Sequence, residues 1–230
     1  MTVVKTVAAH DIVEAVFPRP VTERDEIGIA IGKAIDGTLS RYSHEFAEGR
    51  RPSATSMDRA AAELLDTELE EADVQLPVSD RSALLAQASG VLRAFRRSEV
   101  MGMRRPRSRL VLIGGSAGFY AQPDYWNGRD RFYEMKSYLA IPPPPAVELQ
   151  MRLFQLAFPQ LRAFLACFDR HALPVSTHLA EFPALTSEEA GTLLRTADRT
   201  AREHGQEKVL EYVDNPIVNY PLPPGPAAPV

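Results

Sequence analysis

Two carboxylates and an amine stand close together in the middle of the chain, in the segments 122–124 (Gln-Pro-Asp) and 134–136 (Glu-Met-Lys). Side chains two apart on a strand share one face, so Glu134 and Lys136 should lie together if their segment is extended. Two carboxylates about one ion width apart hold a hard divalent cation through oxygen. We therefore expect Asp124 and Glu134 to be ligands of Mg²⁺ or Mn²⁺.

A metal ion held in this way polarises a scissile phosphate and lowers the pKa of a bound water. Lys136 would orient that water or stabilise the charge that develops on the phosphoryl oxygens. The three side chains together indicate hydrolysis of a phosphoester.

The pair Asn127-Gly128 separates the two segments and is the strongest short hairpin signal in the chain. A tight turn at this pair would set Asp124 opposite about residue 131 rather than opposite Glu134. A bulge or a splayed hairpin is therefore needed to bring the two carboxylates together.

The composition is that of an ordinary soluble globular protein, with 230 residues, 24% charged side chains and a net charge of −4. The acidic balance argues against a passive nucleic-acid coat, but local fields decide whether an enzyme binds nucleic acid. Positive charge is clustered, because seven arginines fall between Arg93 and Arg109.

A single cysteine, Cys167, excludes a disulfide scaffold, a zinc ribbon or a cysteine-ligated iron–sulfur cluster within this chain. No apolar run approaches the roughly 20 residues that span a bilayer, and Asp11 and Glu14 interrupt the first segment where a signal peptide would be apolar. We expect a cytoplasmic protein without a membrane partner.

Hydrophobic periodicity predicts helices, with Thr22, Ser79 or Asp80, and Thr186 or Ser187 as N-caps. The helices are expected at 22–47, 56–72, about 80–97, 145–158 and 187–204. Extended apolar runs predict strands at 110–113, 119–125, 131–139, 161–168 and 175–182.

This order predicts an α/β (α+β) fold, a single domain with a mixed central sheet flanked by helices and an N-terminal helical segment. Residues 1–108 would form the helical part and residues 109–210 the core. Residues 211–230 are a proline-rich tail, expected to be extended or disordered and suited to docking a protein partner.

The arrangement resembles the PD-(D/E)xK nuclease superfamily, in particular its RecB-like exonuclease branch, which includes CRISPR-associated RecB-like nucleases. In that branch a helix beginning Gln-x-x-x-Tyr follows the (D/E)xK strand; here Gln150 matches and Phe154 replaces the tyrosine. The resemblance covers about residues 109–169. It implies a restriction-endonuclease-like domain and metal-dependent hydrolysis of DNA, with Lys136 catalytic and Gln150 supporting the site.

The resemblance also implies a further metal ligand on an N-terminal helix, a histidine or a glutamate. Three positions compete: His44, which we prefer, Glu45 next to it, and Asp36, near a glycine (Gly32) that stands where the branch has histidine.

Arg104, Arg105 and Arg107 are expected to contact the phosphate backbone, because a guanidinium group matches phosphate in shape and charge; the alternative is a solvated helix end and loop. Trp126, with Tyr125 beside it, would either stack on an unpaired base or pack in the core.

These observations predict a Mg²⁺- or Mn²⁺-dependent deoxyribonuclease that acts on DNA ends or single strands. The alternative is a non-catalytic nuclease-fold subunit that binds nucleic acid or a protein partner within a larger complex. A metal-dependent hydrolase of a smaller phosphoester is a third reading.

Overall fold

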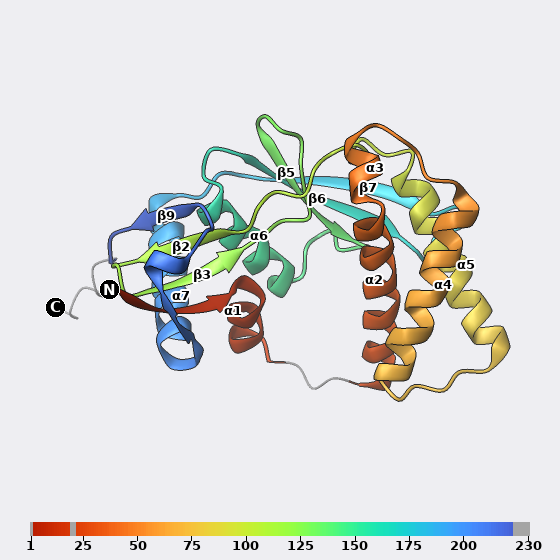
Figure 1. The fold of residues 1–230 in the computed structure, drawn as a ribbon, viewed down its shortest axis with the longest axis horizontal. Coiled ribbons are helices and arrows are strands. Elements are labelled where there is room, and N and C mark those ends of the chain that lie inside the picture. The colour runs from red at the N-terminus through yellow and green to blue at the C-terminus, as the bar shows by residue number, and fades with distance from the viewer. Residues whose placement is uncertain (1, 19–21, 223–230) are drawn as a thin grey trace.

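The computed structural model describes residues 2–18 and 22–222, and Figure 1 shows its two mixed sheets. The first sheet has the strand order β8-β1-β3-β2-β9. Its strands are β1 (Val3–Ala8), β2 (Arg109–Ile113), β3 (Ala117–Ala121), β8 (Gln206–Val209) and β9 (Ile217–Tyr220). The second sheet, in the order β4-β5-β6-β7, has β4 (Tyr125–Trp126), β5 (Arg131–Lys136), β6 (Arg162–Asp169) and β7 (Ser176–Phe182).

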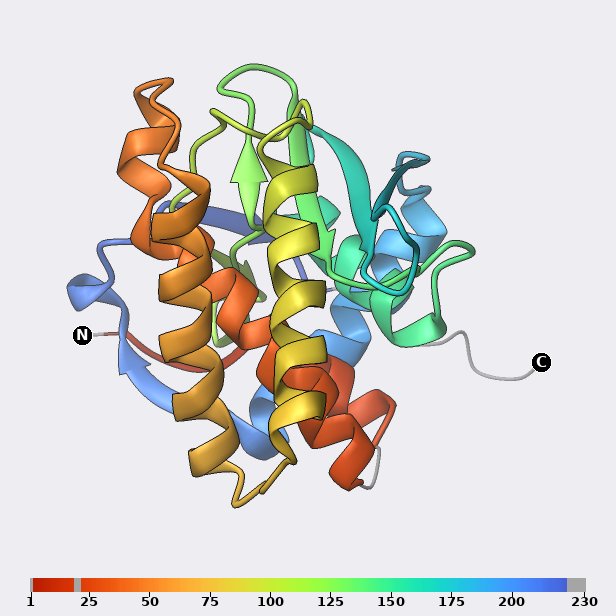
Figure 2. The same cartoon turned by 90° about the vertical axis from the view of Figure 1, so that its right-hand side faces the viewer.

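Helices form a layer at each end of the molecule (Figure 1). Beside the first sheet lie α1 (Ala9–Val16), α6 (Pro145–Ala157) and α7 (Ser187–His204). The opposite layer holds α2 (Glu23–Arg41), α3 (Ser43–Ala47), α4 (Ala54–Glu71) and α5 (Val78–Phe95). Figure 2 shows this layer from its outer side, with α4 and α5 running alongside each other. A short 3-10 helix, η1 (Leu210–Tyr212), follows β8.

The second sheet lies between two hydrophobic cores. Successive side chains along each strand point to opposite faces of the sheet, so each strand contributes to both cores. Phe132 on β5 and Leu165 on β6 pack into the core that contains α6 and the first sheet. Tyr133, Met135 and Phe164 pack into the core formed with α2, α4 and α5. Both faces of this sheet are therefore fixed by packing.

The predicted α/β class is confirmed, with two mixed sheets where one central sheet was expected. Thr22 and Thr186 cap α2 and α7 as predicted, each through a capping box. The prediction of Ser79 or Asp80 as a cap is wrong, since α5 begins at Val78 after Pro77 and no side chain caps it.

The sequence patterns missed the two ends of the chain. Strand β1 pairs with β3, so residues that we assigned to a helical segment enter the first sheet. Strand β9 pairs in parallel with β2, so Ile217–Tyr220 of the proline-rich segment also belongs to this sheet. The remainder of that segment, 223–230, lies outside the described residues. Short strands whose partners are about a hundred residues away carry no local signal.

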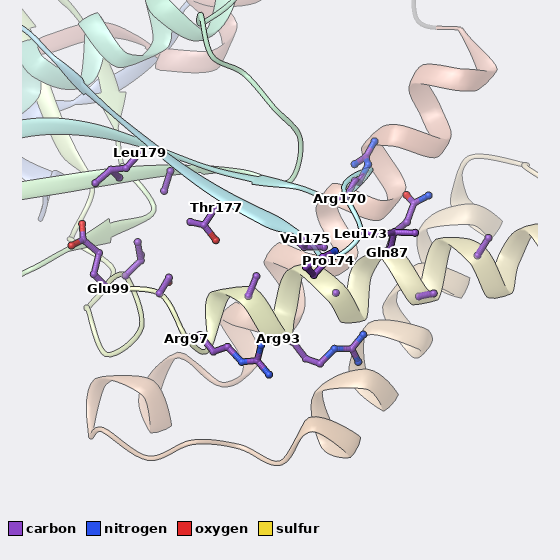
Figure 3. Close-up of a pocket in the computed structure, with 17 residues that line it drawn as sticks. Gln87, Arg93, Arg97, Glu99, Arg170, Leu173, Pro174, Val175, Thr177 and Leu179 are labelled. Carbon is purple, nitrogen blue, oxygen red and sulfur yellow. The ribbon is translucent and has the colours of Figure 1, made fainter.

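Two cavities border the second sheet. The arginine cavity, of about 720 Å³, lies between α5 and the β6–β7 hairpin and contains Arg93, Arg97 and Arg170 (Figure 3). The acidic cavity, of about 700 Å³, lies between α2 and the end of β5 and contains Asp36, Asp124, Glu134, Lys136 and again Arg170.

No helix within the described residues is both long and apolar enough to cross a membrane.

Candidate functional site

The loop between β4 and β5 sets the register of the two carboxylates. Asn127 accepts hydrogen bonds on its side-chain oxygen from the N–H groups of Arg129, Asp130 and Arg131, at 3.0, 3.1 and 3.0 Å. Its own N–H donates to the carbonyl of Arg131 at 3.2 Å, and Gly128 adopts φ +77°, which favours glycine. The connection is therefore wider than a two-residue turn, in agreement with the bulged or splayed hairpin that the sequence required.

The wider loop removes the mismatch in register. Tyr125 pairs with Tyr133 and Trp126 with Phe132, so the next position places Asp124 beside Glu134. The backbone N–H of Met135 donates to Asp124 Oδ2 at 2.8 Å, which fixes this carboxylate at the end of the hairpin.

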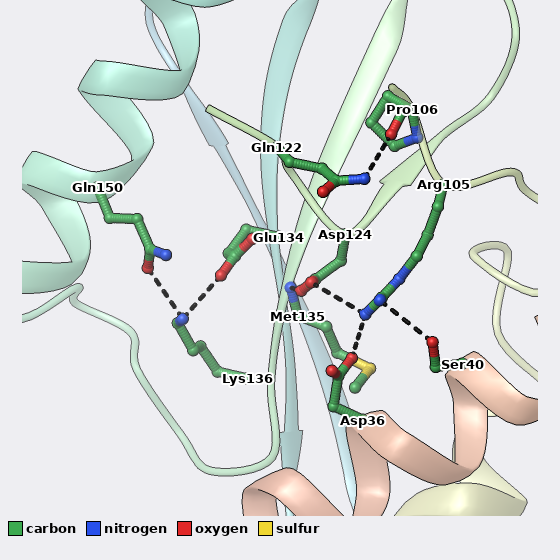
Figure 4. A network of polar contacts seen from close by, with 10 residues as sticks. All are labelled: Asp36, Ser40, Arg105, Pro106, Gln122, Asp124, Glu134, Met135, Lys136 and Gln150. Atoms are coloured by element: carbon green, nitrogen blue, oxygen red, sulfur yellow. Dashed lines mark hydrogen bonds and ion pairs between the residues drawn. The ribbon is translucent and has the colours of Figure 1, made fainter. Parts of the chain in front are cut away.

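Lys136 connects β5 to α6 across the acidic cavity (Figure 4). Its Nζ donates to Glu134 Oε1 at 2.8 Å and to Gln150 Oε1 at 3.0 Å. The side chains of Glu134 and Lys136 are only 7% and 18% exposed, so this ion pair is largely shielded from water. Gln150 of α6 is thus in direct contact with Lys136.

Arg105 lies on the other side of Asp124 (Figure 4). Its guanidinium pairs with Asp36 of α2 and lies 3.8 Å from Asp124 Oδ1. Gln122 donates to the carbonyl of Pro106 at 2.8 Å and so connects the segment 104–107 to the Pro-Asp segment. Arg105 of this segment therefore contacts two carboxylates of the site.

Burial and the charge of neighbouring carboxylates raise the pKa values of Asp124 and Asp36. Burial, followed by the charge of Glu134, raises the pKa of Asp124 to about 7. Burial, followed by the charge of Asp124, also raises the pKa of Asp36. Burial lowers the pKa of Lys136, but the nearby Glu134 outweighs this effect, so its pKa is raised and its amine stays protonated.

The donor set fits a hard divalent cation. Asp124 uses Oδ2 for the Met135 N–H and Glu134 uses Oε1 for Lys136, so each carboxylate keeps one oxygen without an N–H donor within hydrogen-bond distance in the described chain. The two carboxylates repel each other, and a bound cation would neutralise their negative charge. As the described side chains stand, no three His, Cys, Asp or Glu residues form a metal-binding group. Arg105 contacts both Asp36 and Asp124.

Of the three N-terminal candidates, Asp36 is the one that lines the acidic cavity. His44 was preferred from the sequence, but its side chain is 80% exposed and pairs with Glu48 at 3.3 Å, outside this cavity. The physical reason is that α2, which borders the cavity, ends at Arg41, so His44 lies on the separate short helix α3. Glu45 has one buried carboxylate oxygen without a hydrogen-bond partner in the described chain and also lies outside the cavity.

The remaining predicted contacts divide into two groups. Arg104 and Arg107 are exposed, as a backbone-binding role requires. Tyr125 is 3% exposed and packs against Phe95 with ring centroids 5.4 Å apart, so it is a core residue. Trp126 is half-buried, and its indole N–H is buried without a hydrogen-bond partner among the described residues.

Two side chains of the site escaped sequence reasoning. Ser137 is 7% exposed, and Arg170 donates to its hydroxyl at 3.3 Å from the β6–β7 turn. Both line the acidic cavity. Ser137 directly follows the Glu-x-Lys segment, and this position in the sequence could have indicated that it belongs to the site. Nothing in the sequence near Arg170 indicates its place in the site.

Comparison with known proteins gives only distant likenesses. No protein-family model and no curated protein matches the chain. A proposed exonuclease from Eubacterium rectale superposes with a TM-score of 0.42 at 12% identity, over 85% of this chain and 92% of that chain. A protein called SSO0001 gives 0.35 at 13% identity, over 87% of each chain. Similarities this distant leave the function to be argued from the site.

Proposed function

We propose that this chain is a metal-dependent nuclease that hydrolyses DNA phosphodiester bonds by the PD-(D/E)xK mechanism. The observation that carries the proposal is the placement of Asp124, Glu134 and Lys136 in one cavity, with Gln150 bound to the lysine. The register that brings them together depends on the Asn127 loop rather than on the sequence motif alone.

Asp124 and Glu134 hold the cation in this proposal, with Asp36 as the third carboxylate from α2. Mg²⁺ or Mn²⁺, when bound there, polarises the phosphate and supplies a more acidic water. Lys136 is already oriented by Glu134 and Gln150, so its ammonium group can stabilise charge on the phosphoryl oxygens without reorganisation.

Arg105 has two roles in the proposed site. Without substrate it neutralises Asp36 and Asp124. When a cation takes over that neutralisation, the guanidinium becomes available for a phosphate of the substrate. Arg104 and Arg107, both exposed, would extend this contact along the nucleic-acid backbone.

The test is cleavage of labelled single- and double-stranded DNA in Mg²⁺ or Mn²⁺ by the wild type and by Asp124→Ala and Lys136→Ala variants. Arg199→Gln, an exposed change on α7, is the matched control. We expect the wild type and the control to cleave and both site variants to be inactive. Equal weak cleavage by all four proteins would indicate contamination and reject the proposal.

A second candidate, the non-catalytic subunit, is favoured by one observation. Arg105 and Lys136 already neutralise the three carboxylates, an arrangement that is satisfied without a metal. Titration of the protein with Mn²⁺ in a calorimeter separates the two candidates. Saturable Mn²⁺ binding that Asp124→Ala removes supports the enzyme, and DNA binding with neither Mn²⁺ binding nor cleavage supports the subunit.

A further inference from the structure

The arginine cavity has no role in the chemistry above, although it is as large as the acidic cavity. Figure 3 shows it between α5 and the hairpin that carries Leu173 and Leu179. Its hairpin wall is apolar, with Pro174, Val175 and Leu179. Leu179 is 46% exposed, which leaves a hydrophobic surface on an edge strand without a covering element in the described chain.

Arg170 lines both cavities and is the link between them. Its guanidinium donates to Ser137 at 3.3 Å and to the carbonyl of Gly28 at 3.5 Å, while its Nε is buried without a hydrogen-bond partner in the described chain. No carboxylate of the described residues lies within 4.0 Å of it. A partly buried guanidinium without a carboxylate is suited to bind an anion from outside.

Two further guanidinium groups line the cavity near the end of α5. Arg93 lies in the last turn of the helix and Arg97 in the turn that follows it, and both side chains are exposed. Neither has a carboxylate within ion-pair distance among the described residues. The cavity thus combines an apolar wall with three arginines, none of them ion-paired among the described residues. Its lining also holds the carboxylate of Glu99, which accepts a hydrogen bond from Tyr133.

We propose that the arginine cavity holds the unpaired strand of a nucleic acid next to the bond to be cut, with Arg170 bound to a phosphate at the boundary of the two cavities. The arginines match the phosphates in charge and the apolar wall accommodates the bases, as in other grooves that hold single strands. A cavity of this volume takes one or two nucleotides rather than a duplex. This inference rests on the proposed function and specifies its substrate as an unpaired strand.

The test measures binding without cleavage. A short fluorescein-labelled oligothymidylate is titrated with Lys136→Ala protein in EDTA, and fluorescence anisotropy gives the Kd over a range of salt concentrations. When Arg170→Gln is introduced into this Lys136→Ala protein, the Kd for the oligothymidylate should rise about tenfold. Arg93→Gln and Arg97→Gln should each reduce the slope of log K against log salt by about 0.7, the loss of one phosphate contact on a single strand.

Controls separate a specific site from general electrostatics. Arg199→Gln on α7, at the opposite end of the molecule (Figure 1), should change neither the affinity nor the slope. Arg170→Lys, which keeps the charge, should bind with intermediate affinity, and circular-dichroism melting should show that the variants fold. An unlabelled duplex of equal length should compete poorly.

Two results overturn the inference. One is an equal loss of affinity for Arg170→Gln and Arg199→Gln. The other is tight binding that none of the three cavity substitutions changes, even if wild-type protein cleaves DNA. Failure of the proposed nuclease function is recognised separately, by absence of cleavage in Mg²⁺ or Mn²⁺ while the cavity substitutions still weaken binding.

Discussion

The two cavities that meet at Arg170 have nearly equal volumes, about 700 and 720 Å³, but differ in the charged groups that line them. Four carboxylates stand beside three cationic side chains in the lining of the acidic cavity, and such carboxylates attract a cation. Three guanidinium groups and one carboxylate line the arginine cavity, and this excess of positive charge attracts an anion. A phosphodiester substrate with its metal ion would need both a cation site and an anion site. The two cavities together therefore suit such a substrate better than either cavity alone.

The cavities also differ in how their charged groups are held. Asp124 is fixed by a backbone N–H and Lys136 by two side chains, all within about 3 Å. Arg93 and Arg97, by contrast, are exposed side chains at the end of α5 and in the turn that follows it. We therefore expect single substitutions to have large effects in the acidic cavity and graded, salt-dependent effects in the arginine cavity.

Lys136→Met should give the largest difference between the effects on the two cavities. We expect DNA cleavage to fall about 100-fold or more, because the preorganised ammonium group is lost. Binding of oligothymidylate in EDTA should persist, since the arginine cavity is intact. A cleavage time course and anisotropy measure the two effects. Parallel loss of both would mean that the cavities do not act separately.

Asn127→Ala should damage the acidic cavity from a distance. The side-chain oxygen that organises the β4–β5 loop is lost, so we expect about 1–2 kcal/mol of destabilisation and a clear loss of cleavage. Urea denaturation measures the first effect. Asn127→Asp keeps an acceptor and should be milder; equal effects of the two substitutions would contradict the role given to this oxygen.

Asp36→Asn tests whether α2 contributes to the metal site. It removes one carboxylate charge beside Asp124, and we expect Mn²⁺ affinity to fall about tenfold. Calorimetric titration measures the affinity, with Asp66→Asn on α4 as a control outside the acidic cavity. Unchanged Mn²⁺ affinity would remove Asp36 from the site.

The stability of the metal-free protein should depend on the charge of Asp124. Its pKa is raised from 3.8 to about 7, so the folded state favours the protonated form. The associated stability is fully present below pH 4 and is lost as the pH rises through about 7. In EDTA, Asp124→Asn should therefore melt above the wild type at pH 8 and close to it at pH 4. The opposite trend would contradict the raised pKa.

His44→Ala should have the smallest effect. The side chain is exposed and lies outside the acidic cavity, so stability should change by less than about 0.5 kcal/mol and cleavage not at all. A loss of cleavage comparable to that of Asp36→Asn would restore His44 as the ligand favoured by the sequence.

Much of the local structure follows from local signals. Thr22 and Thr186 mark their helices because a hydroxyl and an acid three residues later satisfy free N–H groups. Strands β1 and β9 could not be found in this way, since their pairing partners lie far along the chain. The choice among His44, Glu45 and Asp36 has no local signal either, because it depends on which of these residues the fold brings to the acidic cavity, and only Asp36 lines it.

The sequence by itself determined that an acid and an amine share one strand face, because Glu134 and Lys136 are two residues apart on a strand. Only the tertiary structure decided which groups join them. The Asn127 loop sets the hairpin register that places Asp124 beside Glu134. Arg105 and Asp36 belong to two other segments, and Arg170 belongs to a distant turn. The contacts among these residues depend on loop geometry and long-range packing, which no spacing along the chain encodes.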